Sequence, residues 1–171
     1  MPLIVFAGPP CSGKSTLAAE IARRRLWPHL EMDGVRRRIL PNAAHTREDR
    51  AAAYRAMAWA AEMLGNAVLD APYGHREDRE DIAAIADRIY LIECAVGVET
   101  ALARLAARGP DPVRLDLTSE NTARLVREYR YWGEGLLLDS ETLPTAECLA
   151  RVERYLDSGR MVPARRWAAV S

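Results

Sequence analysis

The chain is short of lysine and cysteine, and it has no net charge. Its 24 acidic residues balance 24 lysines and arginines, and it contains three cysteines among 171 residues. A protein without net charge has no global field that favours nucleic acid or an anionic membrane. Cys11, Cys94 and Cys148 lie far apart, without a metal-ligand or redox spacing. We therefore expect a reduced, cytoplasmic protein.

Long apolar runs are also missing. No stretch approaches the roughly 20 apolar residues that cross a bilayer, and the N-terminus leads into a short apolar run without a signal-peptide pattern. There is no internal repeat and no low-complexity segment. The length suits one domain with a substantial core, and we expect no membrane partner.

Lysine is the scarcest basic residue. Lys14 is the only one, so the other 23 of the 24 basic residues are arginines. The Asn-Lys-x-Asp motif that gives GTPases their base specificity is therefore excluded. Residues 8–16 read G-x-x-x-x-G-K-S-T, the pattern of a phosphate-binding loop (P-loop). An ammonium group is a compact point charge that reaches between phosphates, whereas a guanidinium group is bulkier.

The surroundings of this motif support the same interpretation. An apolar run over residues 1–7 predicts a buried strand, and apolar residues at helical spacing follow the loop. Loop N–H groups and the positive helix end then converge on phosphate oxygens. Gly8 and Gly13 permit the turn, and the Ser15 hydroxyl is placed to ligate Mg²⁺. The predicted nucleotide-binding residues are Gly8, Cys11, Ser12, Gly13, Lys14, Ser15 and Thr16.

Strand and helix patterns alternate along most of the chain. Strands are predicted at the N-terminus and over residues 29–32, 67–70, 88–94 and 136–139. Helices are predicted over residues 14–25, 34–40, 47–64, 76–87, 98–108, 119–131 and 144–157. Such alternation predicts an α/β fold: a five-stranded parallel sheet with helices on both faces. Residues 159–171 are interpreted as a C-terminal surface extension, separate from a domain over residues 1–158.

Asp33 follows the second predicted strand, and Arg36 comes one helical turn later. Ligands of open parallel sheets bind beyond the carboxyl ends of the strands. Asp33 could accept a proton from a substrate hydroxyl there, and Arg36 could hold an anionic substrate group. The alternative is that Asp33 only caps the following helix.

Three further residues fit a phosphate-handling site. Asp70 ends the third predicted strand, where a carboxylate beside a P-loop commonly orders Mg²⁺ or its waters. Arg104 and Arg108 lie four residues apart on one helical face, before a Gly-Pro-Asp-Pro break. A mobile lid could bring both guanidinium groups onto a transferring phosphoryl group. The alternative is a solvated basic stripe.

With these motifs in order, the chain resembles the P-loop kinases related to bacteriophage-type polynucleotide 5′-kinase, zeta toxins and antibiotic phosphotransferases. The resemblance runs from residue 3 to about residue 157. It rests on residues 8–16, Asp33-x-x-Arg36, residues 67–70 with the charged run at 76–80, Arg104-x-x-x-Arg108, and residues 136–144.

The resemblance implies an ATP-dependent, Mg²⁺-dependent kinase with a small helical lid at about residues 104–128. Lys14 would hold the β- and γ-phosphates, and Ser15 and Asp70 would serve the metal. Asp33 would deprotonate the acceptor hydroxyl, and Arg104 with Arg108 would neutralise charge during transfer. The predicted substrate-binding residues are Arg36, Asp70, Tyr73 and Arg79, and the residues that follow the third strand, Tyr73, Gly74 and His75, are candidates for lining the acceptor pocket.

The acceptor stays open between a hydroxyl-bearing small molecule and a nucleic-acid 5′ end. Asp-x-x-Arg resembles the polynucleotide 5′-kinase pattern, but the neutral charge and the lack of interleaved basic and aromatic residues weigh against a long nucleic-acid footprint. Two alternatives remain. One is a zeta-toxin-like kinase of a nucleotide sugar with a neutralising partner, and the other is a nucleotide-dependent switch or ATPase without an acceptor.

Overall fold

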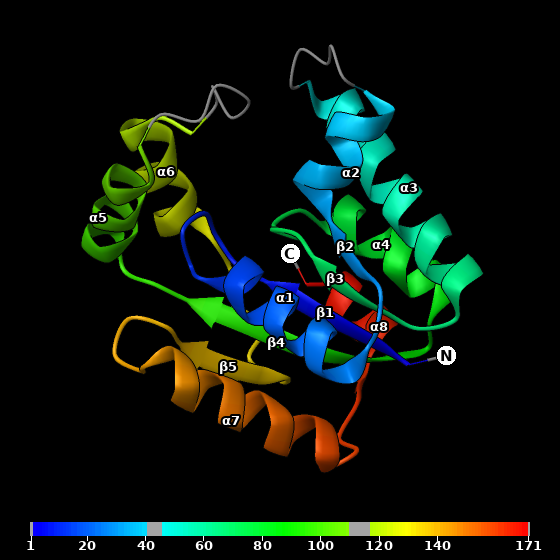
Figure 1. Ribbon diagram of the computed structural model, residues 1–171. Coiled ribbons are helices and arrows are strands. Elements are labelled where there is room, and N and C mark those ends of the chain that lie inside the picture. The colour runs from blue at the N-terminus through cyan, green and yellow to red at the C-terminus, as the bar shows by residue number, and fades with distance from the viewer. Residues whose placement is uncertain (1, 41–45, 110–116, 171) are drawn as a thin grey trace.

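A five-stranded parallel sheet forms the centre of the protein. The structure is a computed structural model, and it describes residues 2–40, 46–109 and 117–170. The strands run in the order β2-β3-β1-β4-β5, with every neighbouring pair parallel (Figure 1). Their bounds are β1 Leu3–Ala7, β2 His29–Glu31, β3 Ala67–Asp70, β4 Arg88–Ala95 and β5 Leu136–Asp139. The predicted α/β fold class is confirmed.

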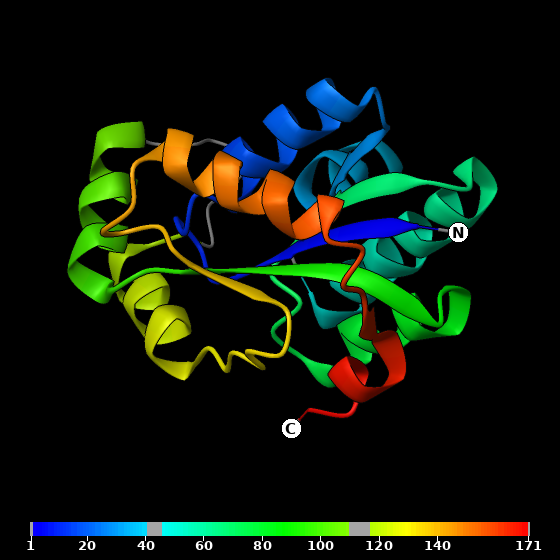
Figure 2. The same ribbon diagram turned by 90° about the horizontal axis from the view of Figure 1, so that it is seen from below.

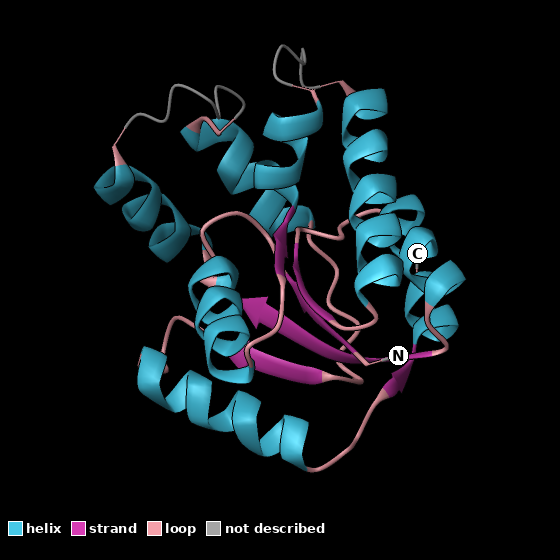
Figure 3. Cartoon of the chain, turned by 45° about the vertical axis from the view of Figure 1, so that its right-hand side comes forward, coloured by secondary structure: helices cyan, strands magenta, loops and turns pink. Residues whose placement is uncertain are grey.

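Helices cover both faces of this sheet, and in Figure 3 the strands lie at the centre with helices around them. The helices over the first 157 residues are α1 Lys14–Arg25, α2 Met32–Ile39, α3 Arg47–Leu64, α4 Arg76–Ile85, α5 Val98–Arg108, α6 Ser119–Glu128 and α7 Thr145–Asp157. Helices α1 and α7 share one apolar core with the sheet, and α3 and α4 share the other. Figure 2 shows α1 and α7 together on one side. The seven predicted helices are present, with ends shifted by a few residues.

Strand β1 explains why the sheet needs both layers. Its five residues are all buried. Leu3, Val5 and Ala7 belong to the core under α3 and α4, whereas Ile4 and Phe6 belong to the core under α1 and α7. Alternate side chains of a strand point to opposite faces, so a strand that is apolar at every position must be covered twice.

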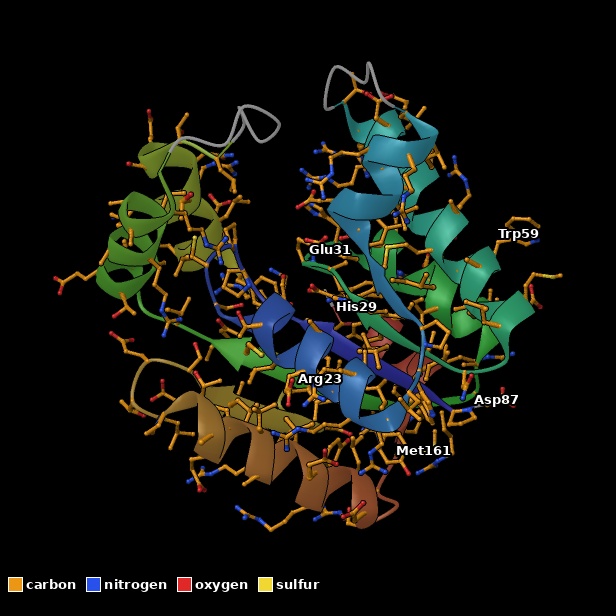
Figure 4. All side chains as sticks on the ribbon, in the orientation of Figure 1. Arg23, His29, Glu31, Trp59, Asp87 and Met161 are labelled. Atoms are coloured by element: carbon orange, nitrogen blue, oxygen red, sulfur yellow. The ribbon has the colours of Figure 1, made fainter. Side chains whose placement is uncertain are left out.

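The C-terminal segment corrects one prediction. It is not a surface extension, because residues Val162–Pro163 form β6, antiparallel to β4, and residues Ala164–Ala168 form α8. Trp167 is 1% exposed and belongs to the core under α3 and α4. The backbone N–H of Ala164 donates to the carbonyl of Asp87 at 2.9 Å. Asp87 and Met161 mark this end of the molecule in Figure 4.

Two helical pairs flank the carboxyl ends of the strands. Helices α2 and α3 pack together on one side, and α5 and α6 pack together on the other (Figure 1). The predicted lid, residues 104–128, takes in the end of α5 and all of α6, while residues 110–116 lie outside the described residues. Within the described residues, no helix is long and apolar enough to cross a membrane.

Candidate active site

The P-loop connects β1 to α1, and its glycines are required by its backbone. Gly8 has φ +150°, and a Cβ there would lie 2.6 Å from the carbonyl oxygen of Cys94. Gly13 adopts φ +80° at the N-cap of α1. Gly8 has no space for a side chain, whereas Gly13 has a left-handed backbone conformation that other residues rarely adopt. The loop leads directly into the N-terminus of the 12-residue helix α1, and a helix N-terminus favours anions.

Lys14 begins α1 and is largely buried, at 8% exposure. Its Nζ donates to the carbonyl of Pro9 at 3.4 Å, so the ammonium group lies over the loop that precedes it. Ser15 is half-buried beside it, and Thr16 is exposed. The single lysine is thus held above the cradle that the loop forms.

Asp70 lies at the carboxyl end of β3 and is 1% exposed. Neither of its oxygens has a hydrogen-bond partner among the described residues, and His29 Nε2 lies 3.7 Å from Asp70 Oδ2. Burial raises the pKa of this carboxyl, but His29, Lys14 and Ser15 outweigh it and hold the pKa below its ordinary value. A buried, ionised carboxylate with free lone pairs next to a serine hydroxyl fits the oxygen ligands that Mg²⁺ takes.

A cavity of about 290 Å³ lies on the α5 side of the P-loop. It is lined by Cys11, Gly13, Thr16, Leu17, Arg104, Ala107, Arg108, Ser140, Leu143, Thr145 and Cys148. Arg104 donates to the carbonyl of Cys11 at 3.0 Å and to the hydroxyl and carbonyl of Ser140 at 3.1 and 2.5 Å. Arg108 is exposed on the same wall. The structure therefore brings Arg104 and Arg108 together beside the loop, with Arg104 bonded to it.

A second, narrower cavity of about 70 Å³ lies on the α2 side of the loop. Asp33 and Arg36 both line it from α2, with Asp33 Oδ1 3.6 Å from Arg36 Nη2. Helix α2 begins at Met32, two residues earlier than predicted, so Asp33 is inside its first turn. Its side chain makes no N-cap hydrogen bond, because the N-cap residue is Glu31. The alternative in which Asp33 only caps the helix is therefore wrong.

The two cavities share the P-loop as a wall. Pro9 and Pro10 line the Asp33 cavity, while Cys11 and Gly13 line the Arg104 cavity. A phosphate held by the loop would thus be reached from both sides. This arrangement can bring a donor nucleotide and a hydroxyl acceptor to one phosphoryl group.

Three polar residues of the Asp33 cavity were not among the predicted site residues: Arg50, Asp78 and Tyr129. Asp78 is buried, and burial raises the pKa of its carboxyl above the ordinary value, while His75 and Arg50 oppose that shift. The charged run after the third strand was noticed in the sequence, but nothing in it singled out Asp78. Arg50 lies in the amphipathic helix α3, where the sequence pattern predicts that a charged residue faces solvent.

The predictions for Tyr73 and Arg79 are corrected. Tyr73 is 1% exposed and packs in the core against Tyr54 and Trp167 rather than lining the cavity. Its φ of +51° turns the side chain away while its neighbours Pro72 and Gly74 line the cavity. Arg79 is buried and donates to the carbonyl of Val170, and burial lowers its pKa. Both residues serve packing.

Comparison with protein families identifies the group. The family model described as an AAA domain matches residues 3–131, which is most of the chain. The chain belongs to the AAA domain family. The matched segment contains the P-loop, Asp33, Asp70 and α5, whereas β5, α7, β6 and α8 lie beyond it. No curated protein matches this member of the family significantly.

Solved structures of kinases share its fold. A sugar kinase from Janibacter sp. HTCC2649 superposes with a TM-score of 0.74 at 16% identity, over 92% of this chain and 95% of that one. A gluconokinase from Sinorhizobium meliloti 1021 gives 0.73 at 19% identity, over 92% of each chain. An APS kinase from Mycobacterium tuberculosis, in complex with AMPPNP and APS, gives 0.69 at 20% identity, over 91% and 96%. At these identities the likeness establishes that this family member shares their fold.

Proposed function

We propose that this protein is an ATP-dependent kinase that transfers the γ-phosphoryl group to a hydroxyl of a small molecule. The observation that carries the proposal is the placement of the buried Asp33 in a cavity that shares the P-loop as a wall with the Arg104 cavity. A switch or ATPase needs a triphosphate cradle, but it has no need of a second cavity with a carboxylate on the far side of the loop.

The proposed reaction is phosphoryl transfer from a nucleotide on the Arg104 side of the P-loop to an acceptor on the Asp33 side. The acceptor oxygen forms a bond to the γ-phosphorus, the bond to the β–γ bridging oxygen breaks, and ADP leaves. Asp33 accepts the hydroxyl proton, and Lys14 with the loop N–H groups stabilises charge on the phosphates. Arg104 and Arg108 stand on the donor side to balance charge during transfer. Ser15 and Asp70 are the residues that would hold Mg²⁺, which neutralises phosphate charge when bound.

Several observations favour a small acceptor over a nucleic-acid end. The Asp33 cavity is narrow, at about 70 Å³, and the chain has no net charge. A nucleic-acid partner would require a basic track for the phosphate backbone. The gluconokinase and the APS kinase that share the fold are named for small-molecule acceptors. Arg36 would hold an anionic or polyhydroxylated part of such an acceptor.

The test is transfer from labelled ATP to a panel of acceptors: sugars, sugar acids, other polyols and a 5′-hydroxyl oligonucleotide. Lys14→Ala serves as the blank, because it removes the only lysine and leaves the acceptor cavity intact. We expect a labelled small-molecule product and no labelled oligonucleotide. Phosphate release at the same rate with and without every acceptor would overturn the proposal in favour of an ATPase. Labelling of the oligonucleotide alone would overturn the small-molecule assignment.

A further inference from the structure

The C-terminal segment lies outside the part of the chain that matches the AAA domain family, yet it packs beneath the Asp33 cavity. The family match ends at residue 131, and α8 begins at Ala164. Helix α8 makes many contacts with α4, the helix that carries Asp78 into the cavity. In Figure 2, α8 lies on the opposite side of the sheet from α1 and α7. The segment is therefore placed to act on the acceptor side.

An aromatic stack connects α8 to the cavity wall. The rings of Trp167 and Tyr73 lie 5.2 Å apart in an edge-to-face arrangement, and those of Tyr73 and Tyr54 also lie 5.2 Å apart. The backbone N–H of Tyr73 donates to the Tyr54 hydroxyl at 3.1 Å. The Tyr73 hydroxyl has no hydrogen-bond partner among the described residues. Ring packing and this one backbone bond thus hold Tyr73 in place.

Tyr73 needs that support because its backbone is in the left-handed region, at φ +51°. A bulky residue leaves that region unless its surroundings fix it. On either side of it, Pro72, Gly74 and His75 line the Asp33 cavity. The carbonyl of Pro72 also accepts hydrogen bonds from the N–H of Gly8 at 3.3 Å and from the Tyr129 hydroxyl at 2.7 Å. A shift at Tyr73 would therefore displace one whole wall of the cavity.

Two further contacts tie α8 to other parts of that wall. The carbonyl of Val170, just after α8, accepts a hydrogen bond from Arg79 of α4. Arg166 lies 5.9 Å over the ring of Trp132 and forms an ion pair with Glu134 at 2.8 Å. Trp132 follows the cavity residue Tyr129 in the segment after α6. Helix α8 thus contacts the three elements that carry His75, Asp78 and Tyr129.

We propose that the C-terminal helix is a positioning element for the acceptor side of the site, with Trp167 as its principal residue. It acts through Tyr73 on the wall formed by residues 72–75, and it reaches the nucleotide side indirectly, through the bond from Gly8 to the Pro72 carbonyl, so its effect on nucleotide binding is the smaller one. The Arg104 cavity borders the other core, under α1 and α7, and none of its lining residues belongs to α8. The kinetic part of this inference rests on the proposed kinase function, whereas its structural part does not.

The test compares four variants. Trp167→Ala removes the ring that supports Tyr73, and Trp167→Phe keeps an aromatic ring there. Trp59→Ala is the same truncation at a residue that is 66% exposed and projects from α3 (Figure 4). Leu156→Ala makes a buried cavity in α7, within the other core. Acceptor KM, kcat and nucleotide affinity are measured for each, together with hydrogen exchange of residues 71–78.

We expect Trp167→Ala to raise the acceptor KM about tenfold, below the roughly hundredfold cost of a 1 Å misplacement, with nucleotide affinity within about twofold of the wild type. Trp167→Phe should restore most of the acceptor KM. Exchange protection at residues 71–78 should fall in Trp167→Ala but not in Trp59→Ala or Leu156→Ala. If Trp167→Ala does not fold, Trp167→Leu replaces it, with the same expected direction.

Unchanged exchange at residues 71–78 in a folded Trp167→Ala protein would overturn the proposal, whether or not an acceptor is known. An equal loss of acceptor and nucleotide affinity would also overturn it, because it would show a general loss of structure. By contrast, absence of kinase activity in the wild type with the expected exchange pattern would overturn only the proposed function.

Discussion

The two sides of the P-loop are built in different ways. The phosphate cradle of the donor side is a run of consecutive residues, 8–16, whose backbone is fixed by Gly8 and Gly13 and by the start of α1, while α5 and the residues around the start of α7 line the rest of that side. The acceptor side is assembled from α2, α3, α4, the segment 72–75 and the residues around α6, which are far apart in sequence. The phosphate cradle of the donor side thus depends on local geometry, and the acceptor side depends on packing.

This difference has a consequence for mutations. A change on the donor side acts where it is made, on phosphate binding. A change on the acceptor side can act from a distance, because Tyr73, Arg79 and α8 support the cavity without lining it. Experiments that separate nucleotide affinity from acceptor transfer are therefore the ones that test the comparison.

The largest expected effect is at Lys14. Lys14→Ala should lower phosphoryl transfer about a thousandfold, the upper range for loss of one electrostatic donor in a preorganised site. Lys14→Arg should not restore it, because the planar guanidinium group does not fit a slot shaped for an ammonium. Single-turnover transfer measures both. Restoration by arginine would show that any cation at this position suffices.

Asp70→Asn comes next. The amide keeps the shape but loses the charge that lies near Lys14 and Ser15, and we expect transfer to fall about a hundredfold. The Mg²⁺ concentration needed for half-maximal binding of a fluorescent ATP analogue should rise. Asp139→Asn is the control, since Asp139 is an exposed carboxylate that bonds to Thr142 and Glu141 at the end of β5. Equal Mg²⁺ dependence in both variants would contradict the assignment of Asp70.

Gly8→Ala tests the local backbone of the donor side. The new Cβ would lie 2.6 Å from the Cys94 carbonyl, and we expect the free energy of unfolding to fall by about 2 kcal/mol, with loss of nucleotide binding. Gly65→Ala is the matched control, because its φ is also positive but nothing lies within 4 Å of the added atom. It should cost about 1 kcal/mol. Urea denaturation measures both, and equal losses would show that space is not limiting at Gly8.

The smallest effect is expected on the acceptor side, at Asp78. Burial holds the pKa of this carboxyl above its ordinary value of 3.8, so ionisation of Asp78 is less favourable in the folded protein than in the unfolded chain. At a pH above the raised pKa, the ionised carboxylate lowers the free energy of unfolding. At a pH below the ordinary pKa, the carboxyl is neutral in both states and this loss disappears. Asp78→Asn should therefore raise the free energy of unfolding at neutral pH, and the gain should shrink as the pH falls toward about 4. A gain that does not depend on pH would show that charge is not its cause.

Much of the fold could be predicted because the sequence signals were local. The apolar run before the P-loop and the helical spacing over residues 47–64 each indicate an element without knowledge of the rest. The C-terminal helix could not be predicted in this way. It has five residues, too few to show periodicity, and two of them are the arginines Arg165 and Arg166. Only the folded chain shows that Trp167, the residue after these two arginines, belongs to the apolar core.

The site residues also differ in whether a local sequence signal could locate them. Residues 8–16, Asp33 and Asp70 could be placed because each follows a strand at the edge where ligands bind. Tyr73 follows such a strand as well, but its positive φ turns the ring into the core. Gly74 and His75 line the cavity, as their place after the third strand indicated, whereas Asp78 and Tyr129 reach it only through tertiary packing. No spacing in the sequence distinguishes them from surface residues.

The most direct test of the account is Asp33→Asn, measured once a phosphorylated acceptor is known. Nucleotide affinity and single-turnover transfer are determined on the same protein. The account predicts transfer reduced at least about a hundredfold, with nucleotide affinity within about twofold of the wild type, because Asp33 lies on the acceptor side alone. Unchanged transfer, or a parallel loss of nucleotide affinity, would contradict the assignment of the two sides of the loop to acceptor and donor.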